Sequence, residues 1–261
     1  MRQHLSCYVW THYADMDPAE SQDAGNGSVV RILEQGFELE SSGGPIDSVS
    51  AGPCIDIGCG PGRTTIAVAD KTEQITIGID LNFSMLRLAS NLLRSRHVSY
   101  PRRRVGLVYD RREFEVQFPR LELVDFWACD ALALPFPDRL FGRAIGMNVL
   151  DSVSSPHTLL RSIANVLVPG GSAILACPYD WTASVTPVES WIGGHSQRNL
   201  NAGECEPFLR RLMTEPHPDA GESEPILQWV SELDHLPWAI RMHDRSTMQY
   251  HVHLVHARRL F

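Results

Sequence analysis

Three glycines at alternate positions are the feature of this chain that most directly suggests chemistry. Gly58, Gly60 and Gly62 follow a short apolar run that contains Asp56, and residues 64–70 after them have apolar side chains at helical spacing. The pattern predicts a strand, a tight turn and a helix. Glycine lets such a turn adopt positive φ angles and lets a ligand approach the main chain closely. Because the helix also begins with free N–H groups, the stretch suits a nucleotide-like cofactor.

The glycine spacing separates this turn from the dinucleotide-binding fingerprint. That fingerprint, G-x-G-x-x-G, requires a third glycine at the position of Arg63, whereas Gly62 comes one residue earlier. The pattern present is D-x-G-x-G-x-G. For this stretch alone, a purely structural glycine turn in another α/β protein is the alternative interpretation.

A second carboxylate follows at the distance expected for a ribose contact. Residues 74–80 are predicted to form a buried strand that ends in Asp80, about 20 residues after the glycine turn. In nucleotide-binding α/β folds, a carboxylate at the end of the second strand accepts hydrogen bonds from ribose hydroxyls. Asp80 is therefore the candidate ribose ligand, with a turn or helix N-terminal acid as the alternative.

Strands and helices that could position these residues alternate along the chain. Further strands are predicted over 123–128, 144–150 and 173–177, and helices over 85–93 and 155–166. Towards the end, residues 225–233 have a helical pattern, and two strands over 238–243 and 250–256 flank a turn. The predicted fold class is therefore α/β, in one large domain.

Three segments stand outside this alternation. Residues 4–13 are aromatic and predict a short helix, and 29–39 predict a second one, with a linker from 41 to 53. Within 97–120, two alternating runs flank a polar turn, which indicates an inserted β-hairpin. The arginine clusters at 102–104 and 111–112 are short and are interpreted as a solvated edge.

Composition excludes several classes of protein. The chain has 261 residues, 43% of them hydrophobic and 21% charged, which is ordinary for a globular protein. Its net charge of −8 argues against a nucleic-acid partner. No leader pattern and no apolar run long enough for a membrane is evident. The six cysteines lie far apart, so neither a disulfide framework nor a zinc site is expected, and a cytoplasmic location is the default.

The motifs together resemble those of class I S-adenosylmethionine (SAM) methyltransferases. The pattern D-x-G-x-G-x-G resembles motif I of that family, and the turn at 167–171, L-x-P-G-G, resembles the turn into its fifth strand. With Asp80 and Asp130 these motifs cover residues 52–178 in the family's order. The resemblance implies a Rossmann-like seven-stranded sheet with helices on both faces and the last strand antiparallel. It also implies that Asp130 contacts the adenine amino group.

SAM is the cofactor that the resemblance implies, and the matching positions define a candidate cofactor site. These positions are Asp56, Gly58, Cys59, Gly60, Gly62, Asp80, Leu81, Met85, Cys129, Asp130, Ala131, Asn148 and Val149.

A narrower resemblance concerns the segments that would cover the site. Residues 177–194 are similar to the P-Y-x-W…T-P-x-x-x-W-x-G-G segment of mercaptohistidine N-methyltransferase domains of ovothiol biosynthesis, and residues 8–13 are similar to that family's Y-x-x-x-H-Y element. Asp180 and the run 199–225 depart from the pattern. The resemblance implies a small-molecule acceptor, most simply a nitrogen of an imidazole or related heterocycle. O- or S-methylation of another metabolite is the alternative.

Methyl transfer to such an acceptor depends mainly on alignment. Holding two reactants in line can contribute about 7–11 kcal/mol to lowering a barrier. A general base is optional for an imidazole nitrogen. The candidate catalytic residues are Tyr179, Asp180, Glu189 and His12, and the candidate acceptor-binding residues are Tyr8, Tyr13, Asp151, Trp181, Trp191 and His195.

These assignments divide the chain 1–261 into functional segments. A helical lid segment is expected within 1–45, the cofactor core over 52–178, an acceptor cap over 179–225, and a C-terminal helix with a strand pair over 226–261. The lid is expected to cover the acceptor against Trp181 and Trp191, so that its deletion would spare SAM binding. His251 and His253 share one strand face, but no third ligand accompanies them and no metal is expected.

Two other classes of function fit part of the pattern. A nicotinamide-dependent oxidoreductase would share the strand, turn and helix and Asp80, but the glycine spacing and the Pro169-Gly170-Gly171 turn argue against it. A non-catalytic SAM-binding protein would keep the glycine motif and lack an acceptor cavity.

Overall fold

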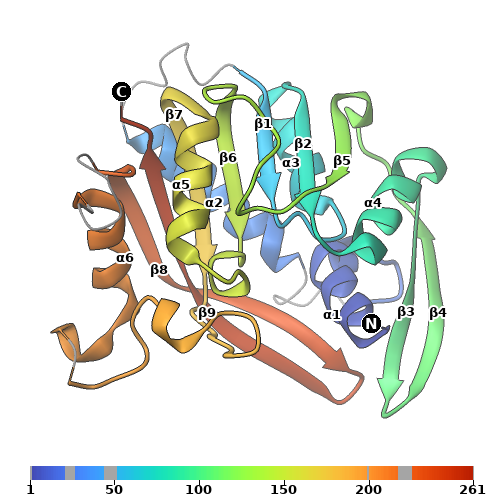
Figure 1. Ribbon diagram of the computed structural model, residues 1–261. Coiled ribbons are helices and arrows are strands. Elements are labelled where there is room, and N and C mark those ends of the chain that lie inside the picture. Colours follow the sequence, from blue (N-terminus) through green and yellow to red (C-terminus); the bar gives the residue numbers. More distant parts are fainter. Residues whose placement is uncertain (1, 21–26, 44–51, 199, 217–224, 261) are drawn as a thin grey trace.

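A computed structural model describes residues 2–20, 27–43, 52–198, 200–216 and 225–260. Seven strands form one sheet in the order β5-β2-β1-β6-β7-β9-β8 (Figure 1). Strand β9 is antiparallel to both of its neighbours, whereas the pairs from β5 to β7 are parallel. The strands are β1 Cys54–Ile57, β2 Thr76–Asp80, β5 Val124–Ala128, β6 Phe141–Met147, β7 Leu167–Cys177, β8 Gln228–His243 and β9 Ser246–Arg258. The fold is therefore the seven-stranded, Rossmann-like class I methyltransferase fold, as predicted.

Helices cover both faces of the sheet. Helices α2 and α3 pack on one face against β1, β6, β7 and β9, and α5 and α6 pack on the other. The helices are α1 Arg2–Tyr13, α2 Ser28–Ser42, α3 Arg63–Thr72, α4 Phe83–Ser95, α5 Pro156–Val166 and α6 Cys205–Thr214, with 3-10 turns η1 Ala14–Met16, η3 Leu121–Leu123, η4 Leu150–Ser152, η5 Val188–Ser190 and η6 Leu200–Gly203. None of the helices in the described residues is long and apolar enough to cross a membrane.

Local sequence signals account for where the core elements begin. The side chain of Asn82 accepts hydrogen bonds from the backbone N–H groups of Ser84 and Met85, which caps α4. Ser155 caps α5 in the same way, with Pro156 in its first turn. Strands β1 and β6 are buried at every position, which is typical of parallel strands covered on both faces.

The helix expected over 225–233 is wrong. Strand β8 begins at Gln228, and its first residues pair with the end of β9, Gln228 opposite Arg258 and Trp229 opposite Ala257. Ile226 and Leu227 before it are buried in the core. Pairing with a partner strand supplies the backbone hydrogen bonds, so tertiary context overrides the local helical pattern. Residues 44–51 of the expected linker, and residues 199 and 217–224 of the expected cap, lie outside the described residues.

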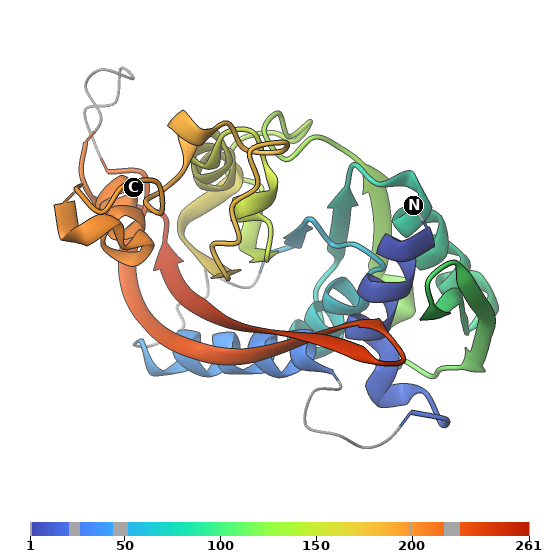
Figure 2. The ribbon, with the colours of Figure 1, turned by 90° about the horizontal axis from the view of Figure 1, so that it is seen from below.

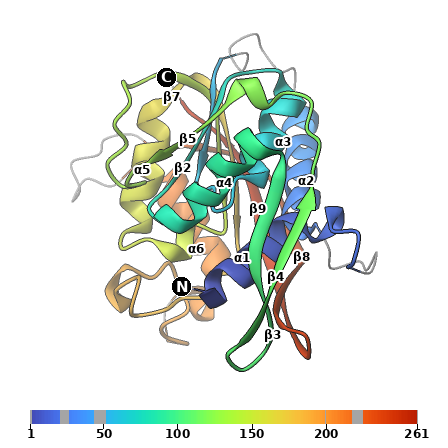
Figure 3. The same ribbon diagram turned by 90° about the vertical axis from the view of Figure 1, so that its right-hand side faces the viewer.

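The predicted insertion is a separate two-stranded sheet. Strands β3, His97–Val105, and β4, Val108–Glu115, form an antiparallel hairpin, which lies beside α1 and the β8–β9 turn (Figure 3). Its inner side chains Val98, Tyr100 and Phe114 are buried with Val9 and Tyr13 of α1. The hairpin thus gives the N-terminal helix an apolar surface to pack on.

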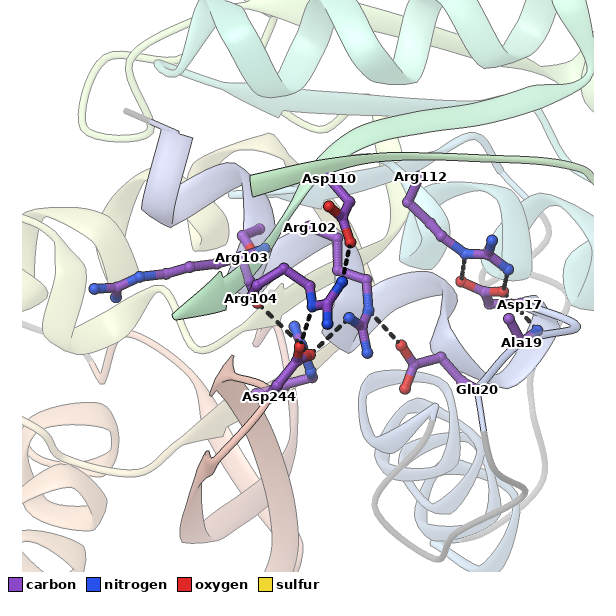
Figure 4. A network of polar contacts seen from close by, with 11 residues as sticks. Asp17, Ala19, Glu20, Arg102, Arg103, Arg104, Asp110, Arg112 and Asp244 are labelled. Carbon is purple, nitrogen blue, oxygen red and sulfur yellow. Dashed lines mark hydrogen bonds and ion pairs between the residues drawn. The ribbon is translucent and has the colours of Figure 1, made fainter. Parts of the chain in front are cut away.

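Arg102, Arg104 and Arg112 form ion pairs with other segments, which corrects their interpretation as a solvated edge. The side chain of Arg111 is 76% exposed, as that interpretation expects. Arg102 and Arg104 each lie 2.6 Å from a carboxylate oxygen of Asp244 in the β8–β9 turn, which also pairs with Arg241 (Figure 4). Arg112 pairs with the buried carboxylate of Asp17, just after α1. The network joins the hairpin, the end of the N-terminal helix and the β8–β9 turn.

Candidate active site

A cavity of about 460 Å³ opens at the carboxyl ends of the parallel strands. Its wall comes from α1, the glycine turn, the segments after β2, β5 and β6, and β8. Figure 2 views the molecule from below and shows α1 beside the β8–β9 hairpin at this side of the sheet. Ligands of open α/β sheets bind at this edge.

The glycine turn has a conformation that other residues would resist. Gly58, Gly60 and Gly62 have φ angles of 72°, 52° and 88°. A Cβ on Gly62 would lie 2.4 Å from Cζ of Phe126, and a Cβ on Gly58 would lie 2.9 Å from Cγ2 of Val149. Gly58 and Gly60 line the cavity, whereas Gly62 packs against side chains inside the protein. The turn therefore exposes bare backbone to a ligand on one side only.

Asp80 organises the cofactor end of the cavity. One of its carboxylate oxygens accepts a hydrogen bond from the N–H of Gly60 at 2.8 Å, and the other accepts from the N–H of Asn82 at 2.7 Å. Burial raises its pKa, and these backbone donors oppose that rise. Asp80 lines the cavity and keeps acceptor capacity for hydroxyl groups. This geometry fits the predicted ribose contact.

Asp56 does not line the cavity, although it was predicted as a cofactor ligand. It is 1% exposed and accepts hydrogen bonds from the hydroxyl groups of Thr64 and Thr65 at 2.5 and 2.7 Å. Burial raises its pKa to about 6. The carboxylate therefore ties β1 to the start of α3. Cys59, which is fully buried, and Gly62 likewise shape the turn without facing the cavity.

The segment after β5 forms the opposite wall. Asp130 is exposed at the cavity, and its Oδ1 accepts a hydrogen bond from the N–H of Leu132 at 2.9 Å. The predicted cofactor residues that line the cavity besides the glycines are Asp80, Leu81, Met85, Cys129, Asp130, Ala131, Asn148 and Val149.

Asn148 combines backbone strain with an unpartnered side-chain atom. It follows β6 with a φ of 56°, and its N–H donates to the carbonyl of Ala176 at 2.8 Å. Its Oδ1 is buried and has no hydrogen-bond partner, although the residue lines the cavity. A strained non-glycine residue with an unsatisfied acceptor is typical of a functional site.

Helix α1 turns one face to the cavity. His4, Tyr8 and His12 line the wall, four residues apart as a helix face requires. Burial, assisted by the charge of Arg63, lowers the pKa of His12 to about 3, so this imidazole is neutral near pH 7. Its ring lies over the glycine turn, with Nε2 3.7 Å from where a Cβ on Gly60 would be. His12 therefore belongs to the cofactor end of the cavity.

Tyr13 lies on the other side of α1 and does not reach the acceptor. It is fully buried, and its hydroxyl donates to the carbonyl of Pro61 at 2.8 Å. Beside it, Arg63 of α3 pairs with Asp15 at 3.3 Å. The last turn of α1 thus supports the glycine turn from outside. The predicted lid segment therefore ends against the glycine turn, and its expected action as a lid stays a prediction.

Tyr179 also points away from the cavity. Its hydroxyl lies 2.7 Å from Nδ1 of His253, whose Nε2 lies 2.9 Å from a carboxylate oxygen of Glu232. Burial raises the pKa of this phenol, so it holds its proton. Tyr179 therefore joins the end of β7 to β9 and β8, and its predicted catalytic role does not follow from its position.

The remaining cap residues predicted to contact the acceptor stabilise the cap itself. Trp181 and Trp191 stack with ring centroids 6.2 Å apart, and their indole N–H groups donate to Cys205 and to the carbonyl of Thr186. Neither tryptophan is among the residues that line the cavity, where α1 contributes part of the wall. Glu189, in the exposed turn η5, and His195, whose Nδ1 lies 3.1 Å from the carbonyl of Gly193, are also outside the wall.

Asp151 and Asp180 lie next to each other, and neither is among the residues that line the cavity. Asp151 is buried, and its Oδ2 accepts a hydrogen bond from the N–H of Asp180 at 2.8 Å. The carboxylate of Asp180 accepts a hydrogen bond from the hydroxyl of Tyr250 at 2.7 Å. The structure therefore joins the two predicted residues directly, and it adds Tyr250 on β9 as a partner of Asp180 that the sequence did not indicate.

Several wall residues were not predicted. Asn82 and Leu132 lie within two residues of the predicted residues Asp80 and Asp130, so the motifs around those carboxylates could have indicated them. Trp238, on β8, had no sequence signal, because only the long β8–β9 hairpin brings it to this edge. The unpredicted wall residues are His4, Thr64, Ile79, Asn82, Leu132, Met147, Ser152, Val153, Ser154, Val185 and Trp238.

Comparison with known proteins agrees with the fold. Residues 55–175 match a family described as a methyltransferase domain. The chain is 27% identical over 167 residues to methyltransferase GfsG of Streptomyces halstedii, covering 64% of this chain and 48% of that protein. It is 21% identical over 190 residues to phosphoethanolamine N-methyltransferase 1 of Arabidopsis thaliana, covering 67% of this chain and 34% of that protein. The chain thus spans half or less of the length of these two relatives.

A similar solved structure is that of the [4+2]-cyclase SpnF, with a TM-score of 0.56 and 17% identity, covering 100% of this chain and 97% of that one. At this identity the likeness concerns the fold. The chain therefore has the class I methyltransferase fold, and residues 55–175 resemble the methyltransferase domain, whose cofactor is SAM. The glycine turn, Asp80 and the unpartnered oxygen of Asn148 fit that cofactor.

Proposed function

We propose that this protein transfers the methyl group of SAM to a small-molecule acceptor, most specifically to a nitrogen of an imidazole or related heterocycle. The observation that carries the proposal is one continuous cavity. It runs from the bare glycine turn and Asp80 to an end lined by Tyr8 and Trp238. The cofactor and an acceptor can therefore lie in contact within this cavity.

The chain's own residues have defined tasks in this reaction. SAM supplies a methyl group that is already activated by its positive sulfur. Gly58 and Gly60 leave room for the cofactor against the backbone, and Asp80 accepts hydrogen bonds from hydroxyl groups. Neutral His12 covers the glycine turn from α1. The protein thus contributes mainly orientation and exclusion of water, which is where most of the rate gain of such a displacement arises.

The choice of an imidazole-type nitrogen rests on the resemblance of residues 177–194 and 8–13 to mercaptohistidine N-methyltransferase domains. O- or S-methylation of another metabolite is the alternative acceptor chemistry. The cyclase with a similar fold illustrates a different class, in which the fold serves another reaction. A SAM-binding protein without transferase activity and a nicotinamide-dependent oxidoreductase are the other candidates.

Calorimetry with SAM, S-adenosylhomocysteine and NAD separates these classes. We expect binding of the first two and none of the third. Mass spectrometry with imidazole derivatives should then show an acceptor 14 Da heavier, the mass of one CH₂ unit gained when a methyl replaces a hydrogen. Binding of NAD alone would support the oxidoreductase, and methylation of protein or nucleic acid alone would contradict a small-molecule acceptor.

A further inference from the structure

The tips of two hairpins lie side by side and project from the same side of the molecule (Figures 1 and 3). One tip joins β3 to β4, and the other joins β8 to β9. The backbone N–H of Asp244 in the second tip donates to the carbonyl of Arg104 in the first at 3.1 Å. The carboxylate of Asp244 also pairs with three arginines. These contacts hold residues 102–110 and 241–248, the paired tips, in one arrangement.

The apex of the β3–β4 hairpin is apolar and exposed. Val105 is 51% exposed, Leu107 92% and Val108 57%. In the described part of the chain, no other large apolar side chain is as exposed as Leu107. A Cβ on Gly106, between them, would have nothing within 4 Å. Single exposed apolar residues are common, but three within four consecutive positions at one apex indicate a contact surface.

Positive charge surrounds this apex. The paired tips contain five arginines and two aspartates. Glu20 pairs with Arg102 from outside the tips, and arginines still exceed carboxylates by two when it is included. Arg111 and Glu113, next to the tips, pair with each other and add no net charge. Because the whole chain has a net charge of −8, the paired tips are a local exception to its charge.

Two of these arginines are available to an external partner. Arg103 and Arg245 form no ion pair with any described residue, and Arg245 is exposed. Nε of Arg103 donates to the carbonyl of Gly106 at 2.8 Å, and Figure 4 shows its side chain pointing away from Asp244. The paired tips therefore present positive charge beside the apolar apex.

Helix α1 connects the paired tips to the cavity. The backbone N–H of Arg103 donates to the hydroxyl of Ser6 at 2.8 Å, and Tyr8, two residues later in α1, lines the cavity. Strand β8, which carries Arg241 of the second tip, also carries Trp238 of the cavity wall. A surface bound at the paired tips would therefore contact elements that also line the cavity.

We propose that the paired tips dock the protein on the surface of an anionic lipid bilayer. Leu107 and the two valines enter the boundary between headgroups and acyl chains, and the arginines pair with anionic headgroups. Such a peripheral contact requires no membrane-spanning helix, and it does not depend on the proposed transferase function.

The small size of the apex favours a bilayer over other partners. A stable protein–protein interface takes about 20–30 residues on each side, whereas the apex offers three apolar side chains. A nucleic acid would pair with the arginines and leave those apolar side chains in water. A bilayer surface accepts both kinds of group within a few ångströms of depth.

Cosedimentation with lipid vesicles tests the proposal. The probes are vesicles of phosphatidylcholine and phosphatidylserine in equal parts and vesicles of phosphatidylcholine alone. We expect at least about tenfold tighter binding to the anionic vesicles, from about 1 kcal/mol for each of two excess arginines. Added salt should weaken this binding, because it screens exposed charges. No binding to the anionic vesicles, or equal binding to both, would overturn the inference.

Variants at the apex locate the apolar part of the contact. Leu107→Ser should weaken binding to the anionic vesicles at least about tenfold, as loss of a buried leucine side chain predicts, and Leu107→Met should retain it. Ile75→Ser is the control, because Ile75 is 58% exposed just before β2, at the amino ends of the parallel strands. The β8–β9 turn lies beyond their carboxyl ends. The control should bind as the wild type does, and an equal loss in both serine variants would contradict the assignment.

Arginine variants test the charged part. Arg103→Gln and Arg245→Gln should each weaken binding about fivefold, the factor that corresponds to about 1 kcal/mol for one basic residue at an anionic surface. Arg139→Gln, at an exposed position before β6, is the control and should bind as the wild type does. If Leu107→Ser and both tip arginine variants keep full affinity, the site is wrong. A dimer that Leu107→Ser dissociates, without binding to vesicles, would instead assign the paired tips to a second copy and overturn the proposal.

Discussion

The cofactor end and the acceptor end of the cavity are built in different ways. Most of the cofactor end comes from the turn at 58–62, Asp80 and the segment 129–132, with His12 over the turn, and it offers backbone groups and carboxylates at strand ends. The acceptor end comes from α1 and β8, which are more than 200 residues apart, and it depends on side chains.

This difference determines how much each region tolerates change. A turn that binds a cofactor through its backbone needs glycines and tightly packed neighbours, so few substitutions are tolerated there. The same turn can serve reactions with many different acceptors. A wall of side chains can change residue by residue without loss of the fold, which is how one fold serves several reactions. Helix α1 links the two regions, because His12 and Tyr13 contact the glycine turn while Tyr8 faces the acceptor.

The largest effect is expected from filling the glycine turn. In Gly62→Ala the new Cβ would meet Phe126 at 2.4 Å with φ at 88°. Strain and overpacking together should lower the free energy of unfolding by about 3 kcal/mol or more. Gly106→Ala is the control, because it also has a positive φ but nothing within 4 Å, and it should cost about 1 kcal/mol. Urea unfolding measures both, and equal losses would contradict a packed turn.

The next effect concerns pH, to which the two sides of the turn should respond in opposite directions. The pKa of Asp56 is raised to about 6, so its contribution to stability is present below its ordinary pKa of 3.8 and is lost as pH rises through 6, about 3 kcal/mol in total. The pKa of His12 is lowered to about 3, so its contribution is present above 6.5 and is lost as pH falls, about 2 kcal/mol by pH 5.

Urea unfolding between pH 4.5 and 8 tests this pair of shifts. Asp56→Asn should gain stability relative to the wild type as pH rises, and His12→Phe should gain as pH falls. Parallel curves for wild type and either variant would show that the group in question has an ordinary pKa in the folded protein.

A moderate effect is expected at the ribose carboxylate. Asp80→Ala removes the acceptor of two backbone N–H groups that shape the cavity, and should weaken S-adenosylhomocysteine binding by about 1–3 kcal/mol. Asp125→Ala is matched, since Asp125 also accepts two N–H groups, from Phe126 and Trp127, but lies outside the cavity wall. Calorimetry should find its affinity unchanged, and unchanged affinity in Asp80→Ala would refute the assignment.

The smallest effect tests whether α1 supports the glycine turn or only covers the acceptor as a lid. Tyr13→Phe removes the buried hydroxyl bond to Pro61 and should cost about 1 kcal/mol of stability together with a few-fold loss of cofactor affinity. Tyr179→Phe removes a similar bond, to His253, outside the cavity wall, and should lower stability alone. If both variants keep full affinity for S-adenosylhomocysteine, the support role of α1 is wrong.

The fold and the cofactor end could be predicted from the sequence because their signals are local. Alternate glycines at 58–62 dictate a turn, Asp80 follows a strand at a set distance, and Asn82 and Ser155 cap helices by contacts within a few residues. Parallel strand ends meet at one edge whatever packs around them. The sequence alone therefore determined the class of fold, and most of the residues that it predicted for the cofactor line the cavity.

Only the tertiary structure decided the acceptor end. Residues 228–233 are a strand because β9 pairs with them, and that long hairpin brings Trp238 to the cavity, with Tyr250 as its cross-strand partner. Tyr13, Tyr179 and Trp191 have the residue types of a binding site, yet they satisfy their polar groups inside the protein. Which face an aromatic side chain presents depends on contacts between segments far apart in the chain, and no local pattern encodes that choice.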